Sequence, residues 1–279
     1  MRRRANFQVQ HLEENDMPYA NINGQNLYYR DSGGGDGPAI VFSHGLLMDH
    51  EMFGPQLHVF RHHYRCITWD ERGHGRTADD HIEPFSYYDS ADDLAALLAH
   101  LGIKQAVLAG MSQGGYLSLR CALTHPEIVR ALILIDTQAQ TEDPAEVGRY
   151  KQMIEVWAQQ GLSDQIADTI EQIILVKGWS GTETWRHKWQ QWQPHNLQAC
   201  FHALVSRDDI SDRLGQIKMP ALVIHGEVDM AITLDRAKDM VQRLPDAKLV
   251  TVPGAGHAVN LTHPAPVNAV IESFLSGLS

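Results

Sequence analysis

Short apolar runs alternate with amphipathic helical segments along most of the chain. Ala39–Ser43 and Val129–Ile135 are almost purely apolar, which is typical of strands buried on both faces. Residues 90–101 begin with a serine cap and early acidic residues and carry leucines at helical spacing, so they predict a helix. Repeated alternation of this kind predicts a mostly parallel sheet with helices on both faces.

Other segments extend the same pattern. Asn23-Gly24 lies between two short segments and is a strong signal for a β-hairpin. Further strands are predicted at 65–69, 106–110, 221–225 and 248–252, and further helices at 115–124, 234–244 and 264–278.

The alternation is interrupted once, between residues 138 and 212. This segment has a helical pattern and is rich in Gln and Trp, with Trp157, Trp179, Trp185, Trp189 and Trp192. We therefore predict an α/β core of residues 19–137 and 213–279, a helical lid of residues 138–212, and a mobile N-terminal arm of residues 1–18. Two roles suit the tryptophans equally: they line a substrate pocket, or they pack the lid on the core.

The segment from Gly110 to Gly114 matches the pattern G-x-S-x-G, with Ser112 at its centre. The pattern alone is short enough to arise by chance, but here it joins a predicted strand to a predicted helix. A sharp turn at such a place holds a serine hydroxyl clear of the sheet. The helix N-terminus then directs free N–H groups at developing negative charge. Ser112 is therefore the candidate nucleophile.

A nucleophilic serine needs a neighbouring base and a carboxylate that orients this base. His257 follows the last predicted strand in the segment GAGH, and this position distinguishes it among the 16 histidines. Asp229 follows the preceding strand in the segment HGEVD and is the candidate acid. Glu227 is a local alternative for the acid, and Asp136, after the strand that ends at residue 135, is a distant one.

The order Ser112, Asp229, His257 on this scaffold resembles the α/β-hydrolase fold superfamily, in particular its serine esterase-like branch of carboxylesterases, enol-lactonases and perhydrolases. The resemblance covers residues 19–278. It implies an oxyanion hole made by the backbone N–H groups of Leu46, in a Ser-His-Gly-Leu segment after an early strand, and of Gln113. It also implies a reaction that needs no metal and no organic cofactor.

Two supporting features follow from the same resemblance. The segment DERGHGRT at residues 70–77 is similar to the family's D-x-R-G-x-G-x-[ST] loop, for which we expect a structural role, with Arg72 bracing the turn. His44, just before the glycine of the oxyanion segment, is expected to fix its loop. The histidines at 58, 62 and 63 favour a solvated helix face over a metal site.

The serine at the elbow favours acyl transfer, because haloalkane dehalogenases and epoxide hydrolases of this fold carry Asp there. We expect a hydrolase that cleaves carboxylic esters through an acyl-enzyme. A lactonase or a C–C bond hydrolase of the same fold is the alternative among enzymes. A ligand-binding sensor with slow turnover is the alternative of another class.

Composition narrows the partners. The formal net charge of −11 disfavours nucleic acid and anionic membrane surfaces. No run of about 18 apolar residues occurs, so no membrane span is expected. Three widely spaced cysteines are typical of a reducing compartment. We expect a cytoplasmic protein that acts on a small-molecule ester or lactone, and the sequence leaves its oligomeric state open.

Overall fold

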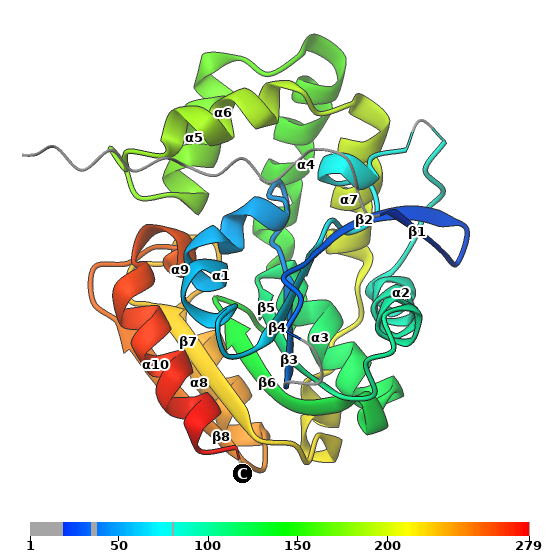
Figure 1. Ribbon diagram of the computed structural model, residues 1–279. Helices are drawn as coiled ribbons and strands as arrows, with labels where there is room; N and C mark the ends of the chain where they lie inside the picture. Colours follow the sequence, from blue (N-terminus) through cyan, green and yellow to red (C-terminus); the bar gives the residue numbers. More distant parts are fainter. Residues whose placement is uncertain (1–18, 35–37, 80, 279) are drawn as a thin grey trace, which may run out of the picture.

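The computed structural model describes residues 19–34, 38–79 and 81–278, so the predicted arm of residues 1–18 lies outside the described residues. Eight strands form one sheet in the order β1-β2-β4-β3-β5-β6-β7-β8 (Figure 1). The six strands from β3 to β8 pair in parallel, as predicted. The strands are β1 Tyr19–Ile22, β2 Gln25–Asp31, β3 Ala39–Ser43, β4 Arg65–Trp69, β5 Ala106–Met111, β6 Val129–Ile135, β7 Ala221–Gly226 and β8 Ala247–Val252.

The predicted hairpin forms one edge of the sheet. β1 and β2 pair antiparallel, with Ile22 opposite Gln25, and β2 continues antiparallel to β4. The two turn residues, Asn23 and Gly24, both have positive φ angles, 48° and 80°. A two-residue hairpin of this hand matches the twist of its strands, which is why the Asn-Gly pair is favoured there.

Helices cover both faces of the sheet because successive strand residues point to opposite sides. On one face, Ile40 and Phe42 of β3 belong to a buried cluster with Phe60 and Ile271. The helices over this face are α1 Gly54–Phe60, α9 Val259–Thr262 and α10 Pro264–Ser276 (Figure 1). On the other face, Val41 of β3 packs in a second cluster. Its helices are α2 Tyr87–His100, α3 Gln113–Thr124 and α8 Leu234–Arg243.

The N-terminal end of α2 differs from the prediction. The helix begins one turn before residue 90, because Ser86 and Asp89 form a capping box in which each side chain binds the backbone of the other. Ser90 lies inside the helix and is buried. The earlier Ser86 is the better cap because the carboxylate of Asp89 lies three residues after it and can close the box.

Four helices lie between β6 and β7 in the chain and group together at one end of the molecule (Figure 1). They are α4 Pro144–Gln160, α5 Asp164–Ile174, α6 Thr182–Gln190 and α7 Pro194–Ser206. We call α4 to α7 the inserted helices. Trp189 of α6 is fully buried, and its indole N–H donates to the carbonyl oxygen of Leu47, in the loop after β3 (3.0 Å). This bond fastens α6 to the core.

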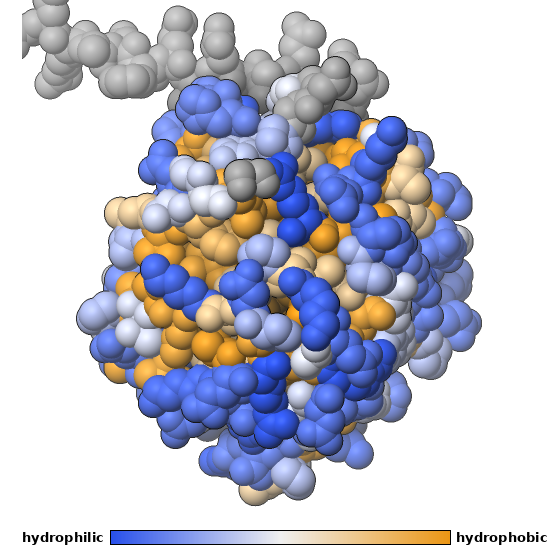
Figure 2. Space-filling model, turned by 90° about the horizontal axis from the view of Figure 1, so that it is seen from below, coloured by the Kyte–Doolittle hydropathy of each residue, from blue (hydrophilic) through white to orange (hydrophobic). Residues whose placement is uncertain are grey.

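Seen from below, hydrophobic side chains show mainly on the left of the surface, and hydrophilic side chains cover its right and lower parts (Figure 2). Within the described part of the chain, no helix is both long and apolar enough to cross a membrane. The three cysteines, Cys66, Cys121 and Cys200, are buried free thiols. The histidines at 58, 62 and 63 are exposed, as predicted, but only the first lies on a helix, because α1 ends at Phe60 and the other two are in the turn after it.

Candidate active site

Ser112 occupies a sharp turn between β5 and α3. Its φ of 52° and ψ of −114° lie outside the regions that residues with a side chain usually adopt. The turn is packed so closely that a Cβ on Gly110 would lie 2.1 Å from the Gly114 carbonyl oxygen. A Cβ on Gly114 would lie 2.0 Å from the Ser43 carbonyl oxygen. The glycines of the G-x-S-x-G pattern are therefore required by close approach of the backbone.

Asp229 and His257 come from neighbouring loops, one after β7 and the other after β8. His257 Nδ1 lies 2.8 Å from Asp229 Oδ2. The other carboxylate oxygen, Oδ1, accepts the backbone N–H groups of Ala231 and Ile232 at 2.8 and 3.1 Å. With Oδ1 held by the backbone, Oδ2 is directed at the imidazole. A carboxylate there favours the proton on Nδ1 and leaves Nε2 free to act as a base.

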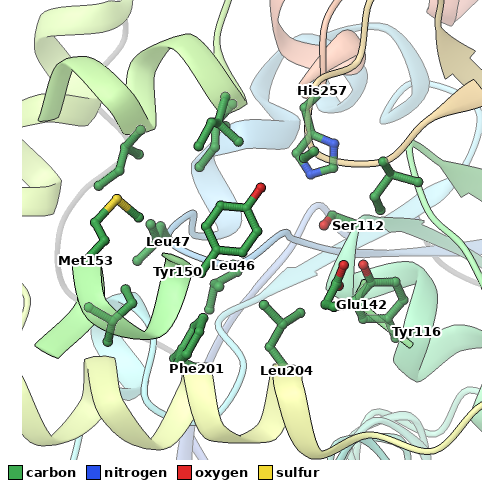
Figure 3. A pocket seen from close by; sticks show the side chains of 16 residues that line it. Leu46, Leu47, Ser112, Tyr116, Glu142, Tyr150, Met153, Phe201, Leu204 and His257 are labelled. Carbon is green, nitrogen blue, oxygen red and sulfur yellow. The ribbon is translucent and has the colours of Figure 1, made fainter. Parts of the chain in front are cut away.

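Ser112 and His257 line one pocket, so the structure brings all three predicted side chains together. Figure 3 shows the His257 ring next to the Ser112 hydroxyl, with the pocket opening beside both. Both residues are largely buried, at 7% and 6% exposure, so bulk water has limited access to them. Reduced access of water strengthens electrostatic interactions between such groups.

Most of the pocket wall is apolar and is shared between the loop after β3, the inserted helices and the loop after β7. The apolar lining residues are Leu46, Leu47, Met153, Ile154, Ile170, Ile173, Ile174, Phe201, Leu204, Ala231 and Ile232. None of the five tryptophans in residues 138–212 is among the described residues that line the pocket. Trp157, Trp185 and Trp189 are instead buried in the cluster that joins the inserted helices to the core.

The backbone N–H groups of Leu46 and Gln113 have no hydrogen-bond acceptor among the residues that the structure describes. Gln113 begins α3 directly after Ser112, and Leu46 lines the pocket. The Gln113 side chain points away from the pocket, since its amide oxygen accepts the hydroxyl of buried Tyr87 (3.3 Å). Only its backbone can therefore serve a substrate.

The two alternative acids lie elsewhere. Glu227 is exposed, and its carboxylate accepts the hydroxyl of Thr251 (3.1 Å). Asp136 is completely buried and accepts the backbone N–H of Gly226 at 2.7 Å and that of Val259 at 3.2 Å. Burial first, and then the charge of Asp229, hold the pKa of Asp136 well above its ordinary value. Of the three carboxylates, only Asp229 is hydrogen-bonded to His257 in the described structure.

Sequence reasoning missed a polar group beside Ser112, formed by Tyr116 and Glu142. Both line the pocket, and Figure 3 shows their oxygen atoms next to each other. Tyr116 lies in the first turn of α3, four residues after Ser112 at its N-cap, a short spacing that could have revealed it. Glu142 carries no comparable signal, because it comes from the loop between β6 and α4. We call Tyr116 and Glu142 the polar wall.

The two supporting loops are held by buried polar contacts. His44 accepts the backbone N–H of Glu71 through Nε2 (3.0 Å), which links the loop after β3 to the loop after β4. Burial lowers the pKa of His44, so the ring stays neutral and can accept. Arg72 pairs with the buried carboxylate of Asp93 in α2 (2.5 Å). Both contacts agree with the expected structural roles.

Two described groups of side chains have the residue types of a metal site. They are Asp49 with His50 and Asp70, and Asp136 with His225 and Asp229. In the first group, Lys188 already pairs with Asp49, and Asp70 accepts the backbone N–H and the ring of His50. In the second, the carboxylates hold the loops described above. In both groups the carboxylate oxygens already have protein partners.

Comparison with known proteins agrees with this architecture. Residues 38–264 match the family described as alpha/beta hydrolase fold, and the chain belongs to this family of hydrolases. The chain is 28% identical to 3-oxoadipate enol-lactonase 2 of Acinetobacter baylyi over 89% of its own length and 92% of that protein.

Two solved structures are similar throughout. A thermophilic esterase from Thermogutta terrifontis, 26% identical, gives a TM-score of 0.82 over 90% of this chain and 93% of the other. The enol-lactonase from Burkholderia xenovorans LB400, 25% identical, gives 0.85 over 93% of this chain and all of the other.

Proposed function

We propose that this protein hydrolyses small carboxylic esters through an acyl-enzyme on Ser112. His257 Nε2 removes the hydroxyl proton while Ser112 Oγ attacks the ester carbonyl carbon. The backbone N–H groups of Leu46 and Gln113 bind the oxyanion of the tetrahedral intermediate. The intermediate collapses as His257 gives its proton to the leaving alcohol. Water, deprotonated by the same imidazole, then releases the acid and restores Ser112.

The observation that carries this proposal is the strained Ser112 next to an imidazole whose other nitrogen is bound to a buried carboxylate. Backbone strain at a turn is costly and persists where the surrounding structure enforces it, as the close contacts at Gly110 and Gly114 do here. Two backbone N–H groups without acceptors in the described structure, those of Leu46 and Gln113, support the assignment of the oxyanion hole, since Leu46 lines the pocket and Gln113 directly follows Ser112. We propose in addition that residues 138–212 act as a lid, since α4, α5 and α7 supply much of the pocket wall.

The test is hydrolysis of p-nitrophenyl esters of increasing chain length by the wild-type protein and by Ser112→Ala. We expect the variant to lose turnover by about 10⁴-fold or more while its unfolding temperature stays close to that of the wild type. A fluorophosphonate should add to the wild type with loss of fluoride and leave Ser112→Ala unmodified, as read by intact mass. A burst without steady turnover would favour the slow sensor, and equal turnover by both proteins would reject the proposal.

Lactone hydrolysis is the second candidate. A lactone is a cyclic ester, so the same steps apply, except that the leaving hydroxyl stays attached to the acyl group. The similarity to enol-lactonases over nearly the whole chain favours it. Neutral γ- and δ-lactones in the same assay, followed by acid release, compare the two activities directly.

We propose in addition that the protein is cytoplasmic. The free buried thiols support this location.

A further inference from the structure

Among the described lining residues, the polar wall contains the only carboxylate that the pocket presents to an acyl group. Glu142 Oε1 lies 2.9 Å from Arg207 Nη1, and its Oε2 accepts the side-chain N–H of Gln138 at 3.3 Å. The Arg207 guanidinium also lies over the Tyr116 ring, 4.1 Å from the ring centre. The arginine side chain is 1% exposed, whereas that of Glu142 is 12% exposed. A substrate therefore meets the carboxylate and not the guanidinium.

Tyr116 provides the complementary donor. Its hydroxyl lies in the pocket next to the carboxylate of Glu142 (Figure 3). Burial first, and then the charge of Glu142, raise the pKa of Tyr116, so the hydroxyl keeps its proton. The polar wall thus offers an acceptor and a donor side by side, next to the nucleophile.

Elsewhere in the described lining, the pocket offers no Lys or Arg side chain that could balance a substrate carboxylate. Among the described lining residues none is Lys or Arg, and the other polar groups are Ser112, His257 and the hydroxyl of Tyr150. An anionic substituent would lie near Glu142 in surroundings that are otherwise apolar. Burying a charge without an opposite partner is strongly unfavourable.

The position of the polar wall selects the acyl half of a substrate. Figure 3 shows His257 on one side of the Ser112 hydroxyl, and Tyr116 and Glu142 on the other. His257 protonates the departing alcohol in the proposed mechanism, so the alcohol lies on its side. The acyl substituents then extend toward the polar wall.

We propose that the polar wall selects esters whose acyl part carries a hydroxyl close to the carbonyl and no negative charge, an inference that rests on the proposed function. A hydroxyl can donate to Glu142 and accept from Tyr116 at once, whereas a methyl group makes neither hydrogen bond. A carboxylate at the same position would face Glu142. Specificity of this kind comes from hydrogen bonds that the wrong substrate cannot make.

The experiment compares four p-nitrophenyl esters of similar length by kcat/KM. They are the butyrate, the 3-hydroxybutyrate, the hemisuccinate, and the methyl succinate, in which the carboxylate is masked. For the wild type we expect the hydroxybutyrate to exceed the butyrate by about tenfold, and the methyl succinate to exceed the hemisuccinate by about 100-fold.

Glu142→Gln tests the residue itself. The amide keeps the shape and can still accept from Arg207, but it removes the negative charge. We expect the penalty on the hemisuccinate to shrink by about tenfold relative to the methyl succinate. Glu155→Gln, an exposed change on α4, is the matched control and should leave every ratio unchanged. Thermal unfolding of both variants shows whether their fold is retained.

Outcomes of the wild-type comparison separate the two proposals. Equal kcat/KM for the hemisuccinate and the methyl succinate, with Ser112-dependent hydrolysis intact, would overturn the selection by the polar wall and leave the proposed function standing. The selection by the polar wall would also be overturned if a folded Glu142→Gln variant kept the wild-type ratio of kcat/KM between the methyl succinate and the hemisuccinate. Absence of turnover on all four esters and on the longer p-nitrophenyl esters would reject the proposed function, and the inference with it.

Discussion

The carboxylate of Asp136, at the end of β6, accepts the backbone N–H of Val259, two residues after His257, at 3.2 Å. Its other oxygen accepts the N–H of Gly226, three residues before Asp229, at 2.7 Å. One buried side chain therefore holds the loops that carry the proposed acid and the proposed base. Asp136, the distant alternative for the acid, therefore positions the loops of Asp229 and His257.

Asp136→Asn should weaken this connection. Asparagine has one oxygen, so one of the two N–H groups is left facing an amide NH₂. We expect a loss of about 1–3 kcal/mol in the free energy of unfolding and about a tenfold lower kcat. Urea unfolding and ester turnover measure the two effects. Asp235→Asn, an exposed change at the start of α8, is the control, and equal effects in both variants would contradict the positioning role.

Asp229→Asn tests the acid directly. The asparagine oxygen can still accept from Ala231 and Ile232, but its NH₂ faces His257 Nδ1 and favours the wrong tautomer. We expect kcat to fall by about 10⁴-fold with little change in stability. The neighbouring Glu227→Gln should keep the activity of the wild type, because Glu227 contacts Thr251 at the surface. If Glu227→Gln lost more activity than Asp229→Asn, the assignment of Asp229 as the acid would be wrong.

Glu71→Gln should stabilise the protein in a pH-dependent way. Glu71 is buried, and neither oxygen of its carboxyl group has a hydrogen-bond partner among the described residues. Burial raises the pKa of Glu71 well above its ordinary value, and the nearby Gln113 amide opposes the shift only in part.

A raised carboxyl pKa in the folded state means that stability is highest below the unfolded pKa, about 4.3, and falls as pH rises through the folded one. The glutamine variant lacks this loss. Its gain in unfolding temperature should therefore be small near pH 4 and reach about 2 °C or more at neutral pH. Unfolding temperatures recorded from pH 4 to 8 measure it. A gain that shrinks as pH rises would have the wrong sign.

Gly114→Ala should damage the elbow. The added Cβ would lie 2.0 Å from the carbonyl oxygen of Ser43 at the end of β3, and neither backbone can move freely. We expect a loss of about 2–4 kcal/mol in stability together with loss of ester turnover. Gly148→Ala in α4 meets no neighbour and should instead add about 0.5–1 kcal/mol. Tolerance of alanine at Gly114 would contradict the close packing.

Much of the fold and part of the site follow from local patterns. The strand–helix alternation predicted the parallel pairing of β3 to β8, and the chain order of Ser112, Asp229 and His257 indicated which loops would meet. Parallel strands bring their carboxyl ends to one edge, so residues far apart in sequence converge there. That general rule needs no knowledge of the particular contacts.

The polar wall could not be predicted in the same way. Glu142 is placed by the path of the chain from β6 into α4, and its partner Arg207 follows α7. Contacts between residues that flank the inserted helices, such as these two, depend on tertiary packing and leave no periodic pattern in the sequence. The predicted start of α2 was wrong for a local reason. Ser90 and Ser86 both suit a cap, and the carboxylate of Asp89 decides between them.

Helix α6 is fastened to the segment after β3 at two points. Trp189 donates to the Leu47 carbonyl oxygen, and Lys188 pairs with Asp49 at 2.6 Å and with Glu51 at 2.7 Å. Leu46, which supplies one N–H of the proposed oxyanion hole, directly precedes Leu47. None of the described lining residues belongs to α6, so removing this helix would take no side chain from the pocket wall. It would free the stretch of backbone that carries the proposed oxyanion donor, so a shortened enzyme would lose rate before it lost affinity.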